Sequence, residues 1–224
     1  MQLDKIVALV PMRHDSKRVQ GKNYRPMCGK PLYAHIVETL LSVPEISQIV
    51  VDTDSAPVLE GLAKDFPQVV ALLRPENLTA DTIPMNEILI HDTSLVPADL
   101  YLQTHSTNPL LKAETISKAI QQLRGHYPEY DSLFSVTRMQ TRLWDGLGRA
   151  INHNPAVLLR TQDLPPIFEE NSCIYLFTRE TLVERRNRLG ERPMMFEMDP
   201  IEATDIDEEH DFILAETLMK LQRI

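Results

Sequence analysis

Residues 6–23 read IVALVPMRHDSKRVQGKN and set the fold class that we expect for the chain. Five apolar residues come first and stop at Pro11, a pattern typical of a fully buried strand. Four cations follow within the next dozen positions: Arg13, Lys17, Arg18 and Lys22. In an open α/β sheet, ligands bind at the loops that leave the carboxyl ends of strands, and cations there suit a polyphosphate. A solvated basic surface loop is the alternative, because the segment lacks the Gly-x-x-x-x-Gly-Lys pattern of a P-loop.

Strand-like and helix-like patterns alternate from this stretch to about residue 135. Short apolar or β-branched runs predict strands at residues 46–51, 69–73, 100–103 and 132–136. Apolar positions at helical spacing predict helices at residues 32–41, 57–66, 86–93 and 113–123. Further strands are predicted at 174–177 and 194–198, and further helices at 179–189 and 208–221. The expected fold class is therefore α/β, a Rossmann-like, mostly parallel sheet with helices on both faces.

The pattern changes between residues 139 and 168, where Gly, Pro and Asn interrupt any long helix. We expect this segment, called the excursion below, to be an insertion of short strands and loops within a single domain spanning residues 1–224. Leu143 and Trp144 are large apolar side chains among its turn residues, and aromatic anchors are enriched at interface centres. The excursion is therefore predicted to form a homodimer contact. Local packing on its own domain is the alternative.

The composition of the chain limits the kinds of partner that it can bind. A chain of 224 residues that is 43% hydrophobic can bury one sizeable core. Its net charge of −9 argues against a duplex nucleic-acid surface, so the basic loop suits a small anionic ligand. Cys28 and Cys173 are too few for a disulfide framework and lack metal-ligand spacing. No run of 18 apolar residues and no signal-peptide pattern is present, so we expect a cytoplasmic protein without a membrane partner.

A second feature is the acidic triplet Asp205-Ile206-Asp207. In an extended segment, residues i and i+2 point to the same side, so the two carboxylates converge while Ile206 is buried. Hard oxygen ligands at this spacing suit Mg²⁺, or Mn²⁺, bound partly through nucleotide phosphates. The alternative is an acidic first turn of the last helix, where carboxylates interact favourably with the helix dipole.

The order of residues around the basic loop resembles a known family. Arg13-x-x-Ser16-Lys17-x-x-x-x-Lys22-Asn23, followed by Gly29-Lys30-Pro31-Leu32, is similar to the nucleotide-binding segment of the CMP-sialic acid synthetases, a family that includes the CMP-KDO synthetases. The resemblance implies that CTP is held by Arg13, Ser16, Lys17, Lys22 and Asn23. Within that set it implies catalytic roles for Arg13, Lys17 and Lys22. His14-Asp15 departs from the small or polar residues that relatives carry, which predicts a stiffer loop.

The same resemblance extends more weakly over almost the whole chain. The family carries a comparable D-x-D before its C-terminal helix as the metal site, which implies metal ligation by Asp207 and, second, Asp205. Arg74 begins a segment similar to the family's R-P-x-x-L, whose arginine helps to hold cytosine. Asp54 ends a strand where relatives have S-T-D, and is expected at the nucleotide. Both residues have a structural alternative, in which Arg74 ties down a loop.

The sugar side matches less well. Residues 102–110 look like the family's L-Q-P-T-S-P-L-R stretch, with two extra residues after Gln103, and the resemblance implies sugar contacts from Gln103 and Asn108. Leu111 stands where relatives have Arg, so either the acid differs or another cation compensates. We expect His105 to be a hydrogen-bonding residue, with general-base duty as the alternative.

Residues 160–175 resemble the family's R-x-Q-x-x-P…E-N-G-x-I-Y region, with Ser172 where relatives usually have Gly. In the family the neighbouring excursion packs against a second subunit, and its basic residues reach the partner's sugar site. The resemblance implies that the sugar acid is gripped by Arg142, Arg160, Gln162 and Asn171.

The expected activity is that of a nucleotidyltransferase. It would join CTP to a 2-keto sugar acid, such as the nonulosonic acid N-acetylneuraminate, by in-line attack on the α-phosphorus, and release pyrophosphate. The same chemistry with another acceptor, such as KDO, legionaminic acid, pseudaminic acid or a phosphonate, is one alternative. A non-catalytic nucleotide-binding module is the other, and the acidic pair argues against it.

Overall fold

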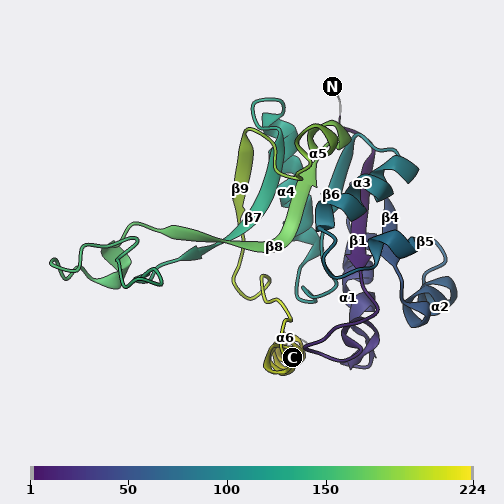
Figure 1. Cartoon of the computed structure of the whole chain (residues 1–224), viewed down its shortest axis with the longest axis horizontal. Coiled ribbons are helices and arrows are strands. Elements are labelled where there is room, and N and C mark those ends of the chain that lie inside the picture. Colours follow the sequence, from purple (N-terminus) through teal and green to yellow (C-terminus); the bar gives the residue numbers. More distant parts are fainter. Residues whose placement is uncertain (1–2, 223–224) are drawn as a thin grey trace.

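The computed structural model describes residues 3–222. A seven-stranded sheet has the order β5-β4-β1-β6-β8-β7-β9 (Figure 1). Its strands are β1 (Ile6–Met12), β4 (Ile46–Thr53), β5 (Val70–Leu73), β6 (Leu100–Gln103), β7 (Ser132–Met139), β8 (Ile167–Phe177) and β9 (Pro193–Glu197). The helices are α1 (Leu32–Leu41), α2 (Ala56–Asp65), α3 (Met85–Leu95), α4 (Ala113–His126), α5 (Arg179–Arg185) and α6 (Glu209–Gln222).

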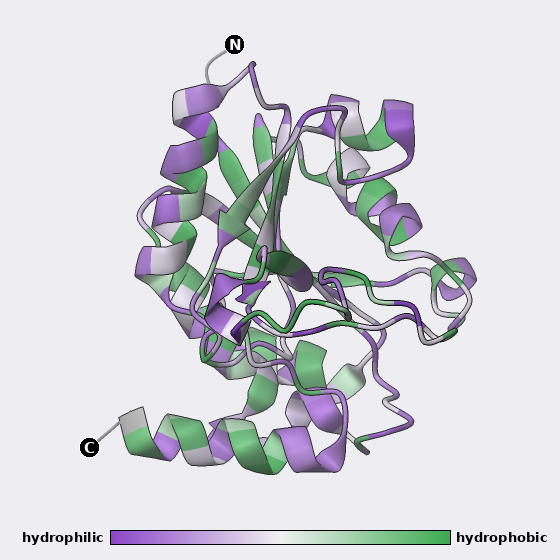
Figure 2. Cartoon of the chain, turned by 90° about the vertical axis from the view of Figure 1, so that its left-hand side faces the viewer, coloured by the Kyte–Doolittle hydropathy of each residue, from purple (hydrophilic) through white to green (hydrophobic). Residues whose placement is uncertain are grey.

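Strand β1 lies inside the sheet and is buried along its whole length. Its even-numbered residues Ile6, Ala8 and Val10 pack in one core cluster with α1, α2 and α4. Val7 and Leu9 point to the other face, where they pack with α3 and α5. Figure 2 shows the apolar strands in the middle, with helices on both sides of the sheet. Helices on both faces explain why the strand reads as an unbroken apolar run and not as an alternation.

The sheet is mostly parallel, as predicted. β1 pairs in parallel with β4 and with β6, and β4 pairs in parallel with β5. β8 runs antiparallel to both of its neighbours, β6 and β7, while β7 and β9 are parallel. The chain moves from β1 outward to β4 and β5 and then returns to the other side of β1 as β6. The loops after β1 and β6 therefore leave the same edge at a topological switch point, where open α/β sheets bind ligands.

The bounds of β7, β8 and α5 differ from the predicted ones. β7 and β8 continue beyond the expected residues 132–136 and 174–177, and pair as far as Met139 and Ile167. The two strands form an arm that carries the excursion away from the sheet (Figure 1). The helix predicted at 179–189 ends at Arg185, because Arg186 adopts a left-handed conformation with φ 49°.

Helix α6 lies beyond the carboxyl end of β1 (Figure 1). Its apolar residues Phe212, Ala215 and Met219 pack with Val19 and Met27 from the segment that follows β1. The C-terminal part of the chain is thereby held against the basic loop. Two short elements lie in that N-terminal segment, the 3₁₀ turn η1 (Lys22–Tyr24) and the ribbon of β2 (Pro26–Met27) with β3 (Lys30–Pro31). Within residues 3–222 there is no helix with the length and apolar character needed to cross a bilayer.

Candidate active site

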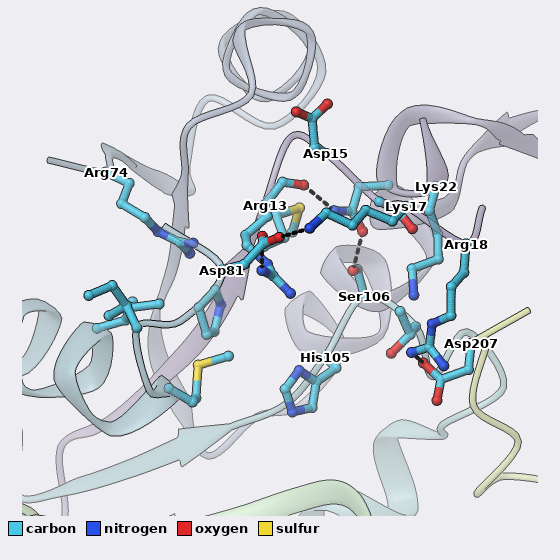
Figure 3. A pocket seen from close by; sticks show the side chains of 18 of the residues that line it. Arg13, Asp15, Lys17, Arg18, Lys22, Arg74, Asp81, His105, Ser106 and Asp207 are labelled. Atoms are coloured by element: carbon cyan, nitrogen blue, oxygen red, sulfur yellow. Dashed lines mark hydrogen bonds and ion pairs between the residues drawn. The ribbon is translucent and has the colours of Figure 1, made fainter. Parts of the chain in front are cut away.

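A cavity of about 690 Å³ opens at the switch point, next to the basic loop (Figure 3). The loops after β1, β5 and β6 and the segment before α6 contribute its walls. Among its polar lining residues are Arg13, Ser16, Lys17, Arg18, Lys22, Asn23, Arg74, Asp81, His105, Ser106, Thr107, Ser172, Asp205 and Asp207. The structure thus brings together the basic loop, Arg74 and the acidic pair, as predicted from the sequence.

The basic loop is braced from inside by Asn23, which is 6% exposed. Its Nδ2 donates to the carbonyl of Arg13 at 2.7 Å, and its Oδ1 accepts from Ser106 Oγ at 2.6 Å. The side chain therefore ties the loop after β1 to the loop after β6. Gly21 turns the chain with φ 64°, and a Cβ there would lie 2.8 Å from Tyr24 Cε2, so the turn requires glycine. Asn23 positions the basic loop as much as it lines the cavity.

His14 belongs to the His14-Asp15 departure from the family pattern, and it also holds the loop in place. Its backbone N–H donates to Asp54 Oδ1 at 2.6 Å, and its Nδ1 lies 2.9 Å from Ser55 Oγ. Its ring stacks on Tyr24 with 5.5 Å between centroids. Asp54, predicted at the nucleotide, supports the basic loop in this arrangement. The contacts agree with the stiffer loop that we expected.

Three of the four cations are paired with carboxylates on the cavity surface. Arg13 contacts Asp81 at 2.6 Å, and Lys17 contacts the other oxygen of the same carboxylate. Lys17 and then Arg13 lower the pKa of Asp81. Arg18 contacts Asp207 at 2.6 Å. Pairs this exposed contribute little to stability, so a polyphosphate can exchange with the carboxylates at small cost.

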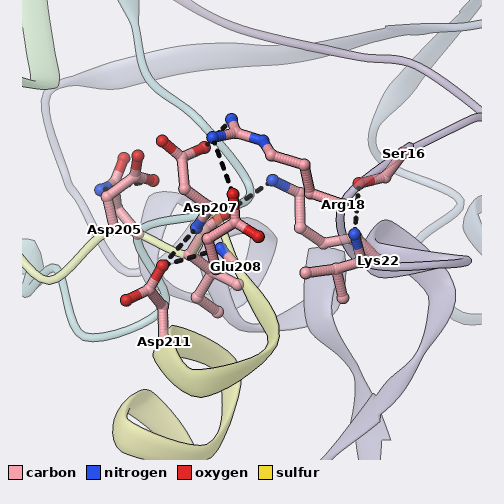
Figure 4. Close-up of polar contacts among 10 residues, drawn as sticks. Ser16, Arg18, Lys22, Asp205, Asp207, Glu208 and Asp211 are labelled. Carbon is pink, nitrogen blue, oxygen red and sulfur yellow. Dashed lines mark hydrogen bonds and ion pairs between the residues drawn. The ribbon is translucent and has the colours of Figure 1, made fainter.

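Lys22 differs from the other three cations because it is partly buried and bonds the backbone. Its Nζ donates to the carbonyl oxygen of Ile206 at 2.6 Å (Figure 4). Burial lowers the pKa of Lys22, while the charges of Asp205 and Asp207 act in the opposite direction. A desolvated ammonium beside the cavity interacts more strongly with a phosphate than a solvated one does.

The acidic pair has the geometry that the i, i+2 spacing predicted. Ile206 is fully buried in the cluster beneath α6, while Asp205 and Asp207 line the cavity. Burial raises the pKa of Asp205, and the charge of Asp207 adds to the effect. Two such carboxylates beside the cations of the basic loop fit a hard divalent ion, which takes oxygen ligands from protein and phosphate together.

Asp211 has a different role from the pair. Its Oδ2 accepts from the backbone N–H of Asp207 at 3.1 Å and of Glu208 at 2.7 Å (Figure 4). A carboxylate on the free N–H groups before a helix is a capping interaction. Asp211 thereby orders the segment that presents the pair.

Arg74 lines the cavity and is also anchored beneath it. The side chain is buried, and its Nε donates to Asp52, which is itself inaccessible to solvent. Arg74 Nη1 is a buried donor with no hydrogen-bond partner among the described residues. The guanidinium thus anchors the loop, as in the structural alternative, and keeps one buried donor unpaired beside the cavity.

Behind Arg74 lies a buried acidic cluster. Asp52, His91 and Asp92 each place one ligand atom within 4.8 Å of the others. Burial and the charge of Asp52 raise the pKa of Asp92 to about 8. Asp52 Oδ2 and Asp92 Oδ2 are both buried and accept no hydrogen bond from another residue in the described part of the chain, and one shared proton satisfies both. Since Arg74 already contacts Asp52, the cluster is a support for that arginine.

The predicted sugar-side residues divide into two groups. Gln103, Asn108 and Asn171 are engaged by other side chains of the domain and are not among the residues that line the cavity. Asn171 bonds Ser135 at 2.5 Å and Thr137 at 2.9 Å, and Asn108 Nδ2 lies 3.5 Å from Asp205 Oδ1. Arg142, Arg160 and Gln162 lie in the excursion and do not line this cavity. Arg160, for example, pairs with Asp163 at 2.7 Å.

The two remaining departures from the family pattern have clear structural outcomes. Leu111 is 2% exposed and belongs to the main core cluster, so this position offers no side chain to the cavity. Ser172 has φ 58°, the left-handed conformation that a glycine adopts without strain. The backbone turn is therefore of the glycine type, and the Ser172 hydroxyl contacts Tyr175 Oη at 3.1 Å.

Two residues of the site had no assigned role from the sequence. Asp81 follows the segment that begins with Arg74 and had no predicted role, yet it receives two of the four cations. Arg188 follows the early end of α5 and lies over the Tyr175 ring, with 3.5 Å from its Cζ to the ring centroid. Neither contact has a local sequence signal, since each joins segments that are distant along the chain or separated by a turn.

Comparison with known proteins agrees with this arrangement. A family model described as cytidylyltransferase matches residues 7–223. The CMP-N,N'-diacetyllegionaminic acid synthase of Legionella pneumophila is 31% identical over 233 residues, which cover 98% of this chain and 98% of that protein. The N-acylneuraminate cytidylyltransferase of Escherichia coli O18:K1:H7 is 25% identical over 227 residues, which cover 96% of this chain and 52% of that protein.

Solved structures show the same fold. A CMP:2-keto-3-deoxy-manno-octonic acid synthetase complexed with CTP superposes with a TM-score of 0.73 at 17% identity. The match covers 97% of this chain and 99% of that chain. At this identity the likeness carries the fold and not the substrate.

Proposed function

The chain belongs to the cytidylyltransferase family, and on that premise we propose that it transfers CMP from CTP to a hydroxyl of a 2-keto sugar acid. One observation carries the proposal. Cations from the loop after β1 and carboxylates from the segment before α6 line the same cavity, although their sequence positions are remote. A protein that merely bound a nucleotide would gain nothing from Asp205 and Asp207 beside the cations.

The reaction requires no protein nucleophile. The acceptor hydroxyl oxygen bonds to the α-phosphorus, the α–β anhydride bond breaks, pyrophosphate leaves and the hydroxyl proton is released. Catalysis is then positioning and charge neutralisation. Arg13, Lys17 and Lys22 hold the triphosphate, Ser16 offers its hydroxyl, and Asn23 keeps the loop in shape. Arg74, which lines the cavity, is the residue that would contact the carbonyl edge of cytosine.

Asp207 and Asp205 are the residues that would hold Mg²⁺ or Mn²⁺. A divalent ion at this position supplies charge neutralisation on the phosphates and a lower pKa for the attacking hydroxyl. The carboxylates themselves lie beside two of the loop cations, since Asp207 contacts Arg18 at 2.6 Å and Lys22 bonds the carbonyl of Ile206. Their mutual repulsion, which helps to raise the pKa of Asp205, favours a cation between them.

For the acceptor we propose a nonulosonic acid, of the class that includes N-acetylneuraminate and legionaminic acid. The support is the name of the Legionella relative, which matches over nearly the whole of both chains. An acceptor outside that class, KDO or a phosphonate, is the second candidate, favoured by the buried Leu111 where the family carries Arg.

Pyrophosphate release tests the proposal. The purified protein is incubated with each NTP in turn, with Mg²⁺ and a panel of 2-keto acids. We expect release with CTP and a nonulosonic acid, and negligible release when either is omitted. Tenfold faster release with GTP or UTP at equal concentration would overturn the choice of base. No release with any acid would overturn the function.

We also propose that the protein is a homodimer in which each excursion packs on the second subunit. Apolar side chains are exposed along the excursion: Trp144 at 52%, Leu147 at 79% and Leu158 at 91%. Exposed apolar groups on a projecting arm are typical of an interaction surface. In such a dimer the excursion would bring Arg142, Arg160 and Gln162 to the cavity of the second subunit. These residues do not line the cavity of their own subunit.

A further inference from the structure

Gln103 is fully buried at the end of β6, and two neighbours determine how its amide is oriented. Arg188 donates a hydrogen bond to Gln103 Oε1, and a guanidinium can act only as a donor. Gln103 Nε2 donates to the carbonyl oxygen of Thr104 at 3.2 Å, and a carbonyl can act only as an acceptor. Both contacts require the same orientation, so the amide oxygen faces Arg188 and the amide nitrogen faces away from it.

This orientation decides the state of His105. The second hydrogen of Gln103 Nε2 points to His105 Nε2, at 2.9 Å. Because the amide nitrogen can only donate, His105 Nε2 must carry the lone pair, and the ring proton must be on Nδ1. An imidazolium would put two N–H groups against each other. Burial and the charges of Arg188 and Lys22 lower the pKa of His105 to about 4, in agreement with a neutral ring.

His105 lines the cavity (Figure 3), whereas Gln103 and Arg188 lie behind it. Its Nδ1 makes no hydrogen bond that is recorded among the described residues, so the Nδ1–H is available to a ligand. Arg188 is held over the Tyr175 ring at 3.5 Å, which keeps its charge behind the histidine. Lys22, on the phosphate side of the cavity, adds a second positive charge. A neutral donor in a positive field suits an anionic oxygen.

We propose that the Nδ1–H of His105 binds a carboxylate oxygen of the acceptor acid, and that Gln103 and Arg188 are positioning residues that fix this tautomer. The proposal rests on the proposed function for the identity of the ligand. The proposal thereby places a cation, Arg188, on the acceptor side of the site. Arg188 acts there through Gln103 and His105. The proposal also excludes His105 as a general base, because its lone pair is occupied by Gln103.

The tautomer can be measured without substrate. Two-bond ¹H–¹⁵N spectra of ¹⁵N-histidine-labelled protein distinguish a protonated ring nitrogen from a bare one. We expect His105 to have a protonated Nδ1 and a bare Nε2 from pH 5.5 to 8. In Gln103→Glu the carboxylate can only accept, so the proton should move to Nε2 and the His105 pKa should rise. An Nε2–H tautomer or an imidazolium at pH 6 in the wild type overturns the proposal, as does an unchanged tautomer in Gln103→Glu.

The ligand contact is tested by kinetics. His105→Leu should raise the KM for the acceptor acid about 10- to 100-fold, the loss expected for a hydrogen bond to a charged group. The KM for CTP should stay within about twofold, and His105→Asn, which can place an N–H near the same point, should recover part of the loss. His126→Leu, an exposed histidine on α4, is the matched control.

The ligand contact and the proposed function can be overturned by different results. An unchanged acceptor KM in His105→Leu would overturn the ligand contact while the proposed function stands. Absence of pyrophosphate release with every acid would overturn the function and the ligand contact together, and the NMR measurement would still decide the tautomer.

Discussion

Lys22 Nζ donates a 2.6 Å hydrogen bond to the carbonyl oxygen of Ile206, the residue between Asp205 and Asp207. The two partners are separated by 184 positions along the chain. This contact joins the basic loop to the acidic pair and places the ammonium beside both. In the proposed reaction the cation and the carboxylates act on the same phosphates, so changes to either should alter turnover more than they alter the fold.

Lys22→Met should reduce turnover without destabilising the protein. The aliphatic side chain keeps the length of the lysine stem and removes one charge contact in the cavity. Loss of such a contact costs about 10² to 10³ in rate. Since burial lowers the pKa of Lys22, the folded state disfavours its charged form, and the Tm of the variant should be equal to or higher than that of the wild type. Pyrophosphate release and thermal unfolding at pH 7 measure the two effects.

Lys64→Met is the control for this change, because Lys64 is an exposed cation on α2 outside the cavity. It should leave both turnover and Tm unaltered. A folded Lys22→Met variant with near-normal turnover would remove Lys22 from the phosphate site.

Asp207→Asn should abolish most turnover and retain CTP binding. Asparagine keeps the size of the side chain and removes the charge that a divalent ion requires, while the basic loop still holds the triphosphate. Pyrophosphate release is followed against Mg²⁺ concentration, and CTP binding by calorimetry. If Asp207 merely complements the dipole of α6, the change costs no more than about 0.3 to 1 kcal/mol of stability and leaves turnover alone.

Glu209→Gln separates the two readings of Asp207. Glu209 lies in the first turn of α6 and pairs with Arg25 at 2.7 Å, outside the cavity. The substitution removes a negative charge that interacts favourably with the α6 dipole, as Asp207 would in the alternative. It should not change the Mg²⁺ dependence of turnover. Equal turnover and equal Mg²⁺ dependence in wild type and Asp207→Asn would contradict the metal assignment.

The fold could be predicted where a short run of consecutive residues is enough to indicate a helix or a strand. β1 and β4 are covered on both faces, so each reads as an apolar run that needs no partner to be recognised. The outer parts of β7 and β8 could not be predicted, because the arm that they form lies beyond the covering helices and its residues are of mixed polarity. The end of α5 was also missed, since Arg186 adopts a left-handed conformation that favours glycine or asparagine.

The residues of the candidate site likewise divide into those that a local sequence pattern predicts and those that it does not. Asp205 and Asp207 could be predicted because the i, i+2 alternation is local and Ile206 marks the buried side. Arg188 could not, because its role depends on the fold of β6 and β8 and on the early end of α5. The Arg13–Asp81 pair joins residues 68 positions apart and likewise has no local signal.

Asp92→Asn should reduce the fall in stability with rising pH. The folded pKa of Asp92 is raised to about 8, whereas its ordinary value is 3.8. Between these values the folded protein holds a proton that the unfolded chain releases, so stability falls as pH rises through this window. Asparagine does not titrate and can still donate to Asp52. The Tm difference between variant and wild type should therefore grow by about 3 °C or more from pH 5 to pH 8.

The control is Asp65→Asn, an exposed carboxylate at the end of α2. It should give parallel Tm curves for variant and wild type. A parallel pair of curves for Asp92→Asn would mean that the buried carboxyl is ionised throughout this range.

Mixing two inactive variants should restore activity if the excursion serves the second subunit. Lys22→Met lacks a working cavity but keeps its excursion, and Arg160→Ala keeps its cavity but loses an excursion cation. In a mixed dimer, the cavity of the Arg160→Ala subunit faces an intact excursion. Random exchange should then recover roughly a quarter of wild-type turnover, because half of the dimers are mixed and each has one complete site. Sedimentation checks that dimers form, and Leu158→Lys, which charges the most exposed apolar residue of the excursion, should yield monomers. Dimers that show no recovery would mean that Arg160 acts within its own subunit or not at all.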